Sequence, residues 1–240
     1  MRKFLESLRS DGVRFVDVVR TGPLEAVVPT CPGWTLADLT RHMGEVHRWV
    51  VLAVETVERP REDQIDGPHG ASHDELANWL RDGLDRLLAV LAAKDPASPT
   101  WHPFSAPKVA GVWPRRQAQE TMVHRWDAEN AVGAVTPLDP PIAADGILEY
   151  FELIVPRVVV RDGRAAPRGV LRIECPDVDM VCTVSSGTTV DVELGDGVAA
   201  SPDATIRANA EDVLLALWKR VSLPGDHPPL TRDWLAFGGN

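Results

Sequence analysis

The sequence predicts an α+β protein of two domains, a helical bundle over residues 1–162 and a smaller α/β domain over residues 163–240. Apolar residues recur at helical spacing through the first two-thirds of the chain and then alternate with polar residues, as in half-buried strands. Between these regions lies a segment of charged residues with Gly163 and Pro167, which we interpret as a linker. The hydrophobic fraction of 44% is enough for a packed core.

Two amphipathic helices are expected at the start of the chain. Apolar residues between Leu8 and Val19 fall on one face of the first helix. Thr35 and Asp38 have the spacing of a capping box, in which each residue bonds the backbone N–H of the other. The second helix should therefore begin there and extend over residues 36–57.

Three more helices complete the expected bundle domain. Ser72 and Glu75 form a second capping-box signal, and a stripe of leucines follows over residues 76–91. Pro114 suits a first helical turn, so a fourth helix is predicted over residues 114–132. Residues 139–155 read as the fifth helix.

The C-terminal region reads as strands followed by a helix. Alternating apolar residues predict strands at 170–174, 181–184, 189–194 and 205–208. The apolar spacing at 213–220 predicts a closing helix. Turn signals separate the strands at 185–187 and 195–197.

Composition limits the classes of function. The net charge of −10 argues against a nucleic-acid-binding surface. No apolar run approaches the roughly 18 residues of a membrane span, and the N-terminus lacks the apolar stretch of a signal peptide. We therefore expect a cytoplasmic protein that binds neither nucleic acid nor a membrane.

The cysteines support this interpretation. Cys31, Cys175 and Cys182 are odd in number and widely spaced, which predicts reduced thiols and not a disulfide framework or a thiolate zinc site. Cys31 precedes a helix start, where a thiolate is favoured. No spacing links it to a base, so we interpret it as a loop thiol and not as a nucleophile.

Three side chains form a candidate metal site. His42 lies on the apolar stripe of the second helix, whereas His47 lies about 140° further around it. Glu120 and His124 are one turn apart on the fourth helix, so all three groups should face inward. Two imidazoles and a carboxylate are ligands of catalytic zinc with an open fourth position. The alternative is a Glu–His⁺ pair that neutralises itself in the core.

Neighbouring charges fit supporting roles. Asp127 and Asp38 are spaced to accept hydrogen bonds from the two imidazoles, although they fit equally as a surface charge and a helix cap. Arg125 and Glu129 are expected on the opposite face of the fourth helix, toward solvent.

These motifs resemble a known family. Residues 32–39 with His42, and Glu120 through Asp127, resemble the mycothiol-dependent maleylpyruvate isomerase family, part of the DinB-like group of metal-binding four-helix bundles. Residues 203–220 resemble the family's smaller, sterol-carrier-protein-like α/β domain. The resemblance spans nearly the whole chain and implies a DinB-like bundle followed by that domain.

The resemblance also implies a site and partners. A divalent metal, usually zinc, would be held by His42, Glu120 and His124, with an open position for the thiol of mycothiol. An arginine of the C-terminal domain would bind a small, anionic, electrophilic substrate. Arg220 matches it best, and Arg207 is the second candidate.

The implied chemistry is isomerisation. The metal lowers the pKa of the thiol, and the thiolate adds to a conjugated cis double bond. The resulting single bond rotates, and elimination of the thiol leaves the trans product. Arg220 would hold a substrate carboxylate.

Other functions stay open at this point. A mycothiol S-transferase would use the same ligands, and a hydrolase would need a base for which the sequence offers no candidate. A non-enzymatic module would carry an apolar ligand in the C-terminal domain, with a structural metal or none in the bundle. Substrate identity should depend on the loops at 60–71 and 95–113.

Overall fold

A computed structural model describes residues 1–65, 67–68, 72–187, 189–195 and 201–238. The chain forms two compact units, which we describe separately. The first comprises residues 1–102 and 107–136, and the second comprises residues 103–106 and 137–240. This division differs from the expected one at residue 162, because the helices that follow Pro137 pack against the second unit's own elements.

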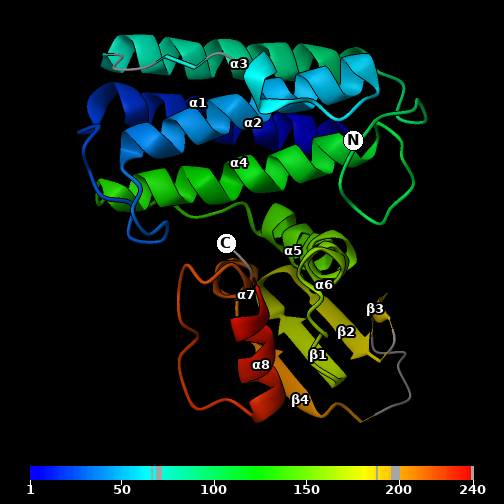
Figure 1. The fold of residues 1–240 in the computed structure, drawn as a ribbon. Coiled ribbons are helices and arrows are strands. Elements are labelled where there is room, and N and C mark those ends of the chain that lie inside the picture. The colour runs from blue at the N-terminus through cyan, green and yellow to red at the C-terminus, as the bar shows by residue number, and fades with distance from the viewer. Residues whose placement is uncertain (66, 69–71, 188, 196–200, 239–240) are drawn as a thin grey trace. The chain divides into compact units, whose positions relative to one another are not determined.

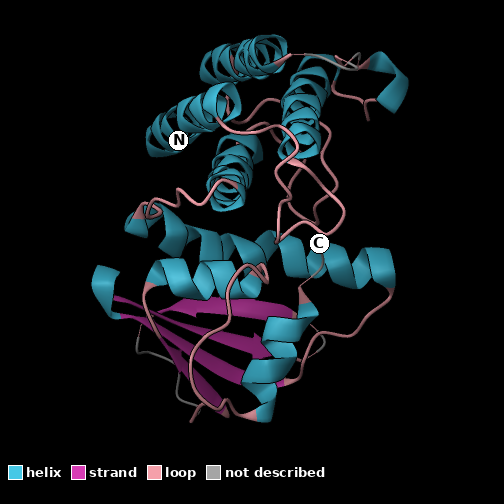
Figure 2. Ribbon diagram, turned by 90° about the vertical axis from the view of Figure 1, so that its left-hand side faces the viewer, coloured by secondary structure: helices cyan, strands magenta, loops and turns pink. Residues whose placement is uncertain are grey.

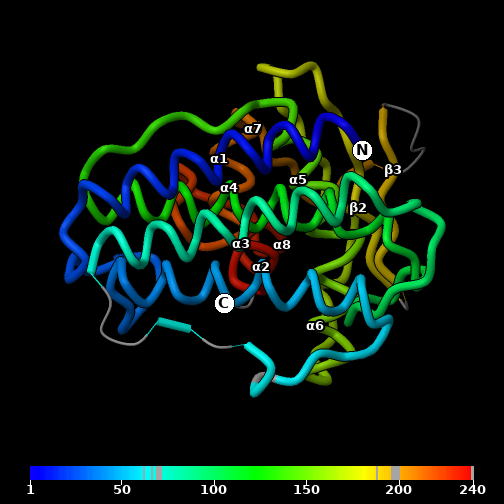
Figure 3. The backbone as a smooth tube through the Cα atoms, turned by 90° about the horizontal axis from the view of Figure 1, so that it is seen from above, coloured from blue at the N-terminus to red at the C-terminus, as the bar shows by residue number. Residues whose placement is uncertain are grey.

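The first unit is a four-helix bundle within the described residues (Figure 1). Both α1 and α2 pack against α3 and α4, so the helices enclose one core. In Figure 3 the long helices α1, α2 and α3 lie side by side along their lengths. The helices are α1 (Arg2–Thr21), α2 (Leu36–Thr56), α3 (His73–Ala93) and α4 (Val112–Ala131), with a short 3-10 turn, η1 (Glu62–Gln64), before α3.

Both predicted capping boxes are confirmed. The Thr35 backbone N–H donates to Asp38 Oδ2 at 3.0 Å, and the Asp38 N–H donates to Thr35 Oγ1 at 3.3 Å. Ser72 and Glu75 make the same reciprocal bonds at the start of α3. Each box satisfies N–H groups that have no partner within the helix, and so fixes where the helix begins.

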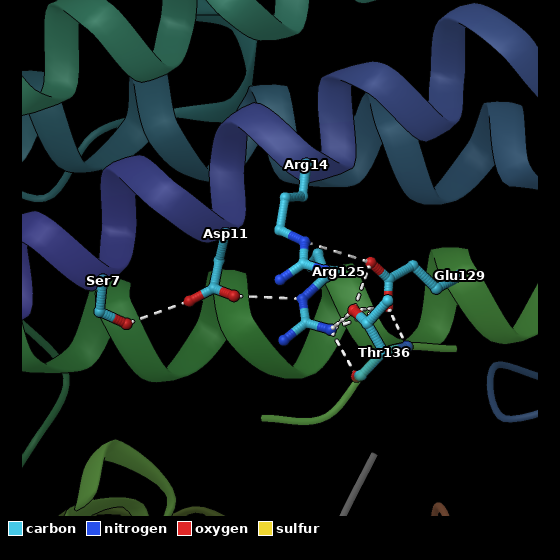
Figure 4. Close-up of polar contacts among 6 residues, drawn as sticks. All are labelled: Ser7, Asp11, Arg14, Arg125, Glu129 and Thr136. Atoms are coloured by element: carbon cyan, nitrogen blue, oxygen red, sulfur yellow. Dashed lines mark hydrogen bonds and ion pairs between the residues drawn. The ribbon is translucent and has the colours of Figure 1, made fainter. Parts of the chain in front are cut away.

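A buried polar network joins α1 to α4 (Figure 4). The expectation that Arg125 and Glu129 face solvent is wrong, since both side chains are almost fully buried. Arg125 Nε donates to Asp11 Oδ1 at 3.1 Å, and Arg125 Nη1 donates to Glu129 Oε2 at 2.8 Å. Thr136 bonds both Arg125 and Glu129 from beyond the end of α4. Because α1 packs along this face of α4, the face is interior to the bundle.

The second unit combines helices with a sheet (Figure 2). The sheet has the order β3-β2-β1-β4 in the described residues; β1–β2 and β2–β3 are antiparallel, while β1–β4 is parallel. Helices lie along one face of it (Figure 2). The elements are α5 (Pro140–Glu149), a π-helical turn η2 (Tyr150–Ile154), α6 (Val155–Asp162), β1 (Gly169–Cys175), η3 (Pro176–Val178), β2 (Met180–Ser186), β3 (Val190–Leu194), β4 (Ala204–Arg207), α7 (Ala210–Leu217) and α8 (Pro229–Phe237).

The α+β class and the four predicted strands are confirmed. The fifth predicted helix is interrupted by η2, and α8 has no counterpart in the prediction. Residues 196–197 of the second turn signal, and residues 66 and 69–71 of the loop assigned to substrate identity, lie outside the described residues. No helix of the part of the chain described here is long and apolar enough to cross a membrane.

Candidate metal centre

The bundle brings the three predicted ligands together. His42 comes from α2, and Glu120 and His124 come from successive turns of α4. Glu120 Oε1 lies 3.7 Å from His42 Nε2 and 3.5 Å from His124 Nε2. Ligand atoms bound at about 2.0–2.1 Å to a tetrahedral zinc lie roughly 3.3 Å apart. The two distances are therefore close to those of a coordinated set.

His42 lies at the margin of the bundle, not in its core. Its side chain is 33% exposed, whereas the His47 side chain is buried. The expectation that His42 shares the inner stripe and that His47 lies on another face is thus reversed. The reason is that α2 packs against both α3 and α4, which buries a wider face centred on Met43, His47 and Val50. A marginal position leaves the candidate centre open to small molecules.

His47 remains a neutral core residue beside the centre. Its Nε2 lies 3.3 Å from the hydroxyl of Thr121, and Nδ1 has no hydrogen-bond partner among the described residues. Burial, together with the charge of Arg48, lowers the pKa of His47 to about 3. The imidazole is therefore uncharged at neutral pH, and it contributes packing to the wall behind the candidate ligands.

Glu120 has a different partner on each oxygen. Oε1 faces the two imidazoles, while Oε2 accepts a bond from Arg116, one turn earlier on α4. Burial raises the pKa of Glu120, but Arg116 and the two imidazoles outweigh it and hold that pKa well below its usual value. The carboxylate is thus ionised and oriented. Arg116 is absent from the residues predicted for the site, although its i, i+4 spacing from Glu120 is a signal in the sequence.

His124 is held from its other ring nitrogen. Its Nδ1 lies 2.9 Å from Oδ2 of Asp127, a fully buried carboxylate. Burial lowers the pKa of His124, but hydrogen bonds with Asp127, Cys31 and Glu120 raise it well above its usual value. A carboxylate behind a ligating imidazole fixes the ring and its tautomer. Asp127 has that position, whereas the Asp38 carboxylate accepts from the Thr35 backbone N–H in the capping box of α2.

The loop before α2 closes the far side of His124. Thr30 Oγ1 donates to Asp127 Oδ1 at 2.6 Å, and Cys31 Sγ lies 3.8 Å from Asp127 Oδ2. No local sequence pattern pairs Cys31 with His124, because nearly a hundred residues separate the two. The ring of Trp34, from the same loop, lies 4.9 Å from the ring of His42. One loop therefore lines both sides of the centre.

The residues present fit a divalent metal by the chemistry of their donors. Ligand atoms of His42, Glu120 and His124 all lie within 4.8 Å of one another. The set offers two imidazoles and one carboxylate, with Glu120 already ionised; His124, whose pKa is raised, would release a proton when an ion binds. The exposed fractions of 33%, 23% and 12% leave a side of the set accessible.

The sequence of the bundle decides the family. Residues 5–129 match the family model described as the mycothiol maleylpyruvate isomerase N-terminal domain. The chain belongs to this family. All three candidate ligands lie within the matched residues.

The fold of this chain is similar to that of a solved structure. The crystal structure of the mycothiol-dependent maleylpyruvate isomerase aligns with a TM-score of 0.56, over 90% of this chain and 87% of that chain. Sequence identity is 11%, so this likeness concerns the fold alone. No curated protein matches the sequence.

The two candidate arginines lie in the second unit. Arg207, on β4, pairs with Glu174 of β1 on the surface of the sheet. Arg220 follows α7 and is half-buried; its Nη1 donates to the Trp218 carbonyl at 2.7 Å. Arg220 also lines a pocket of about 480 Å³, whose other lining residues include Lys219, Val221, Leu223, His227, Arg232 and Leu235.

This pocket combines positive charge with apolar side chains. Two arginines, a lysine and a histidine contribute to its lining, beside valine and leucine side chains. Such a lining is suited to an organic anion. The pocket distinguishes Arg220 from Arg207, whose side chain is 68% exposed and forms an ion pair with Glu174.

Proposed function

We propose that this family member is a divalent-metal-dependent isomerase that uses mycothiol, with a substrate of the maleylpyruvate type. The observation that carries the proposal is the convergence of His42, Glu120 and His124 on the accessible margin of the bundle, within the matched domain. Zinc suits two imidazoles, one carboxylate and an open fourth position. The substrate would be a small, electrophilic acid, and mycothiol would be the thiol partner.

Each residue of the centre has a distinct task in this proposal. His42, Glu120 and His124 would hold the ion, which when bound lowers the pKa of a thiol so that a thiolate forms at neutral pH. Asp127 holds the His124 ring by accepting from Nδ1. Arg116 keeps Glu120 ionised and turns Oε1 toward the imidazoles.

The thiolate would then act on an activated double bond. Its sulfur adds to one carbon of a cis-configured, conjugated bond, and the electron pair moves onto the substrate's carbonyl group. Rotation about the new single bond follows, and the thiol leaves as the double bond re-forms in the trans configuration. Mycothiol is regenerated, so it is needed in catalytic amounts only.

Arg220 is the proposed partner of a substrate carboxylate. The cationic and apolar lining of its pocket supports an acidic organic ligand over a purely apolar one. This favours the enzyme over a carrier of apolar ligands. Arg220→Gln should keep the metal content of the wild type and raise KM for the acid, whereas unchanged KM and kcat would exclude Arg220 as the partner of the substrate carboxylate.

Metal content tests the ligand set. Wild-type protein purified without chelator should hold about one zinc or similar ion per chain, and His124→Ala and Glu120→Gln should hold far less. His47→Gln is the matched control, because this buried imidazole lies beside the centre but outside the ligand set. A full metal complement in Glu120→Gln, or none in reconstituted wild type, would contradict the proposed centre.

Product analysis tests the reaction. Incubation of the metal-loaded protein with maleylpyruvate and catalytic mycothiol should yield the trans isomer at unchanged mass, with the thiol recovered. A stable adduct whose mass includes mycothiol would identify an S-transferase instead. Turnover at the same rate without any thiol would contradict both thiol-dependent functions.

A further inference from the structure

The imidazole of His124 stands between two groups of metal-binding atoms. Its Nε2 faces Glu120 and His42, the centre described above. Its Nδ1 faces Asp127 at 2.9 Å, and Cys31 lies on the same side. Ligand atoms of Cys31, His124 and Asp127 all lie within 4.8 Å of one another. The second group is therefore as compact as the first, but it contains a thiol.

We propose that Cys31, Asp127 and Nδ1 of His124 form a second metal position, selective for thiophilic ions, that competes with the first for His124. Thiolate, imidazole and carboxylate are all established ligands of zinc-like ions. A thiolate makes such a set softer than two imidazoles and a carboxylate, which favours ions such as Cd²⁺ and Cu⁺.

The distances suit an ion after a small adjustment. Sulfur and oxygen ligands at about 2.3 and 2.0 Å from a tetrahedral ion lie roughly 3.5 Å apart. Cys31 Sγ and Asp127 Oδ2 are 3.8 Å apart. The 2.9 Å between Asp127 and His124 is a hydrogen-bond distance, so the ring must move back by roughly 0.5 Å to admit an ion.

The loop that carries Cys31 is built in a fixed shape. Val27 pairs with Thr35 across the base of the loop, and the Val28 N–H donates to the Trp34 carbonyl at 2.9 Å. Inside it, the Cys31 N–H donates to the Val28 carbonyl at 3.1 Å. These bonds hold the thiol beside the ring, and little conformational freedom is lost when it binds an ion.

Asp127 is oriented for the same role. Thr30 donates to Oδ1 at 2.6 Å and leaves Oδ2 toward Cys31 and His124. A neutral imidazole has one nitrogen that can accept a metal, the other being protonated. Ligation through Nδ1 therefore excludes ligation through Nε2, and a thiophilic ion at Cys31 would withdraw His124 from the first centre.

Cadmium titration tests the proposal on the intact chain. Metal-free wild-type protein titrated with CdCl₂ should develop the near-ultraviolet charge-transfer band of a cadmium thiolate. Cys31→Ser should abolish the band, and Asp127→Asn should weaken cadmium binding at least tenfold. His42→Ala should keep the band, because His42 belongs only to the first centre. This variant separates the proposal from the proposed function, whose metal it removes.

Two results would overturn the proposal. Absence of the band in the wild type would mean that Cys31 and Asp127 only orient His124. Loss of the band in His42→Ala, with wild-type binding in Asp127→Asn, would place Cys31 among the ligands of the first centre. Cys31→Ser is a near-isosteric change of a half-buried loop residue, so circular dichroism should show an intact fold in this variant.

Discussion

Replacement of Arg125 by methionine should destabilise the bundle strongly. Arg125 is 1% exposed and bonds Asp11, Glu129 and Thr136 (Figure 4). Methionine fills much of the same volume but leaves two carboxylates, 10% and 5% exposed, without this cation. Removal of one partner from a buried ion pair costs about 3–5 kcal/mol. With a urea m-value of about 2 kcal/mol/M, the unfolding midpoint should fall by roughly 2 M.

Tryptophan fluorescence is the appropriate assay, because six of the eight tryptophans lie in the first unit. Arg14→Met is the matched control: Arg14 lies 3.8 Å from Glu129 and is 47% exposed. Exposed pairs contribute less than about 1 kcal/mol, so the control should lose no more than that. Both variants replace an arginine near the same carboxylate, and they differ mainly in burial.

The pH dependence gives an independent test of the cause. Burial already raises the pKa of Asp11, and Arg125 opposes that rise. Without Arg125 the pKa of Asp11 must rise further. A carboxyl whose pKa is higher in the folded than in the unfolded state takes up a proton first in the folded state, so the folded state gains stability as the pH falls. The deficit of Arg125→Met should therefore shrink between pH 7 and pH 5. A deficit that is constant with pH, or equal to that of Arg14→Met, would refute the electrostatic reasoning.

Two further predictions concern other buried groups. Burial, aided by the charge of Arg48, lowers the pKa of His47 to about 3. The contribution of His47 to the stability of the fold is therefore complete above pH 6.5 and is lost as the pH falls toward 3. When the pH is lowered from 7 to 5, the free energy of unfolding, measured by urea denaturation, should fall by about 2 kcal/mol more in the wild type than in His47→Gln. Equal losses in the two proteins would exclude a neutral, buried His47 as the cause. Burial raises the pKa of Cys175 and Cys182 to about 12. An alkylating reagent at pH 8 should modify neither thiol before denaturation, as peptide mass spectrometry would show.

The sequence predicted the fold best where short-range chemistry decides it. The capping boxes at Thr35 and Ser72 located two helix starts, because the partners lie only three residues away. Period-two alternation located the strands for the same reason. By contrast, α8 begins at Pro229, spans nine residues and buries few of them, so its local pattern is weak. The unit to which α5 belongs depends on long-range packing against α7, which no local pattern encodes.

Within the candidate metal centre, too, local spacing predicted some positions, and long-range packing decided the others. The spacing of Glu120 and His124 placed both groups on one face of α4 correctly, since they are a single turn apart. The positions of His42 and His47 could not be assigned this way. An apolar stripe gives the direction of one neighbour, but α2 has two, and the buried face lies between them. The position of Cys31 is harder still to predict, because its contact with Asp127 depends on how the loop before α2 closes over α4.

Arg116 and the candidate metal centre share the carboxylate of Glu120. A buried carboxylate needs a compensating positive charge, and Arg116 already supplies one to Glu120. Its guanidinium bonds Oε2, and Oε1 is directed at His42 and His124. If neutralisation were the whole purpose, both oxygens of Glu120 could be bonded by the guanidinium in the bidentate manner that arginine favours. The division of Glu120 between two partners instead keeps one oxygen available for an ion, while the other fixes its direction.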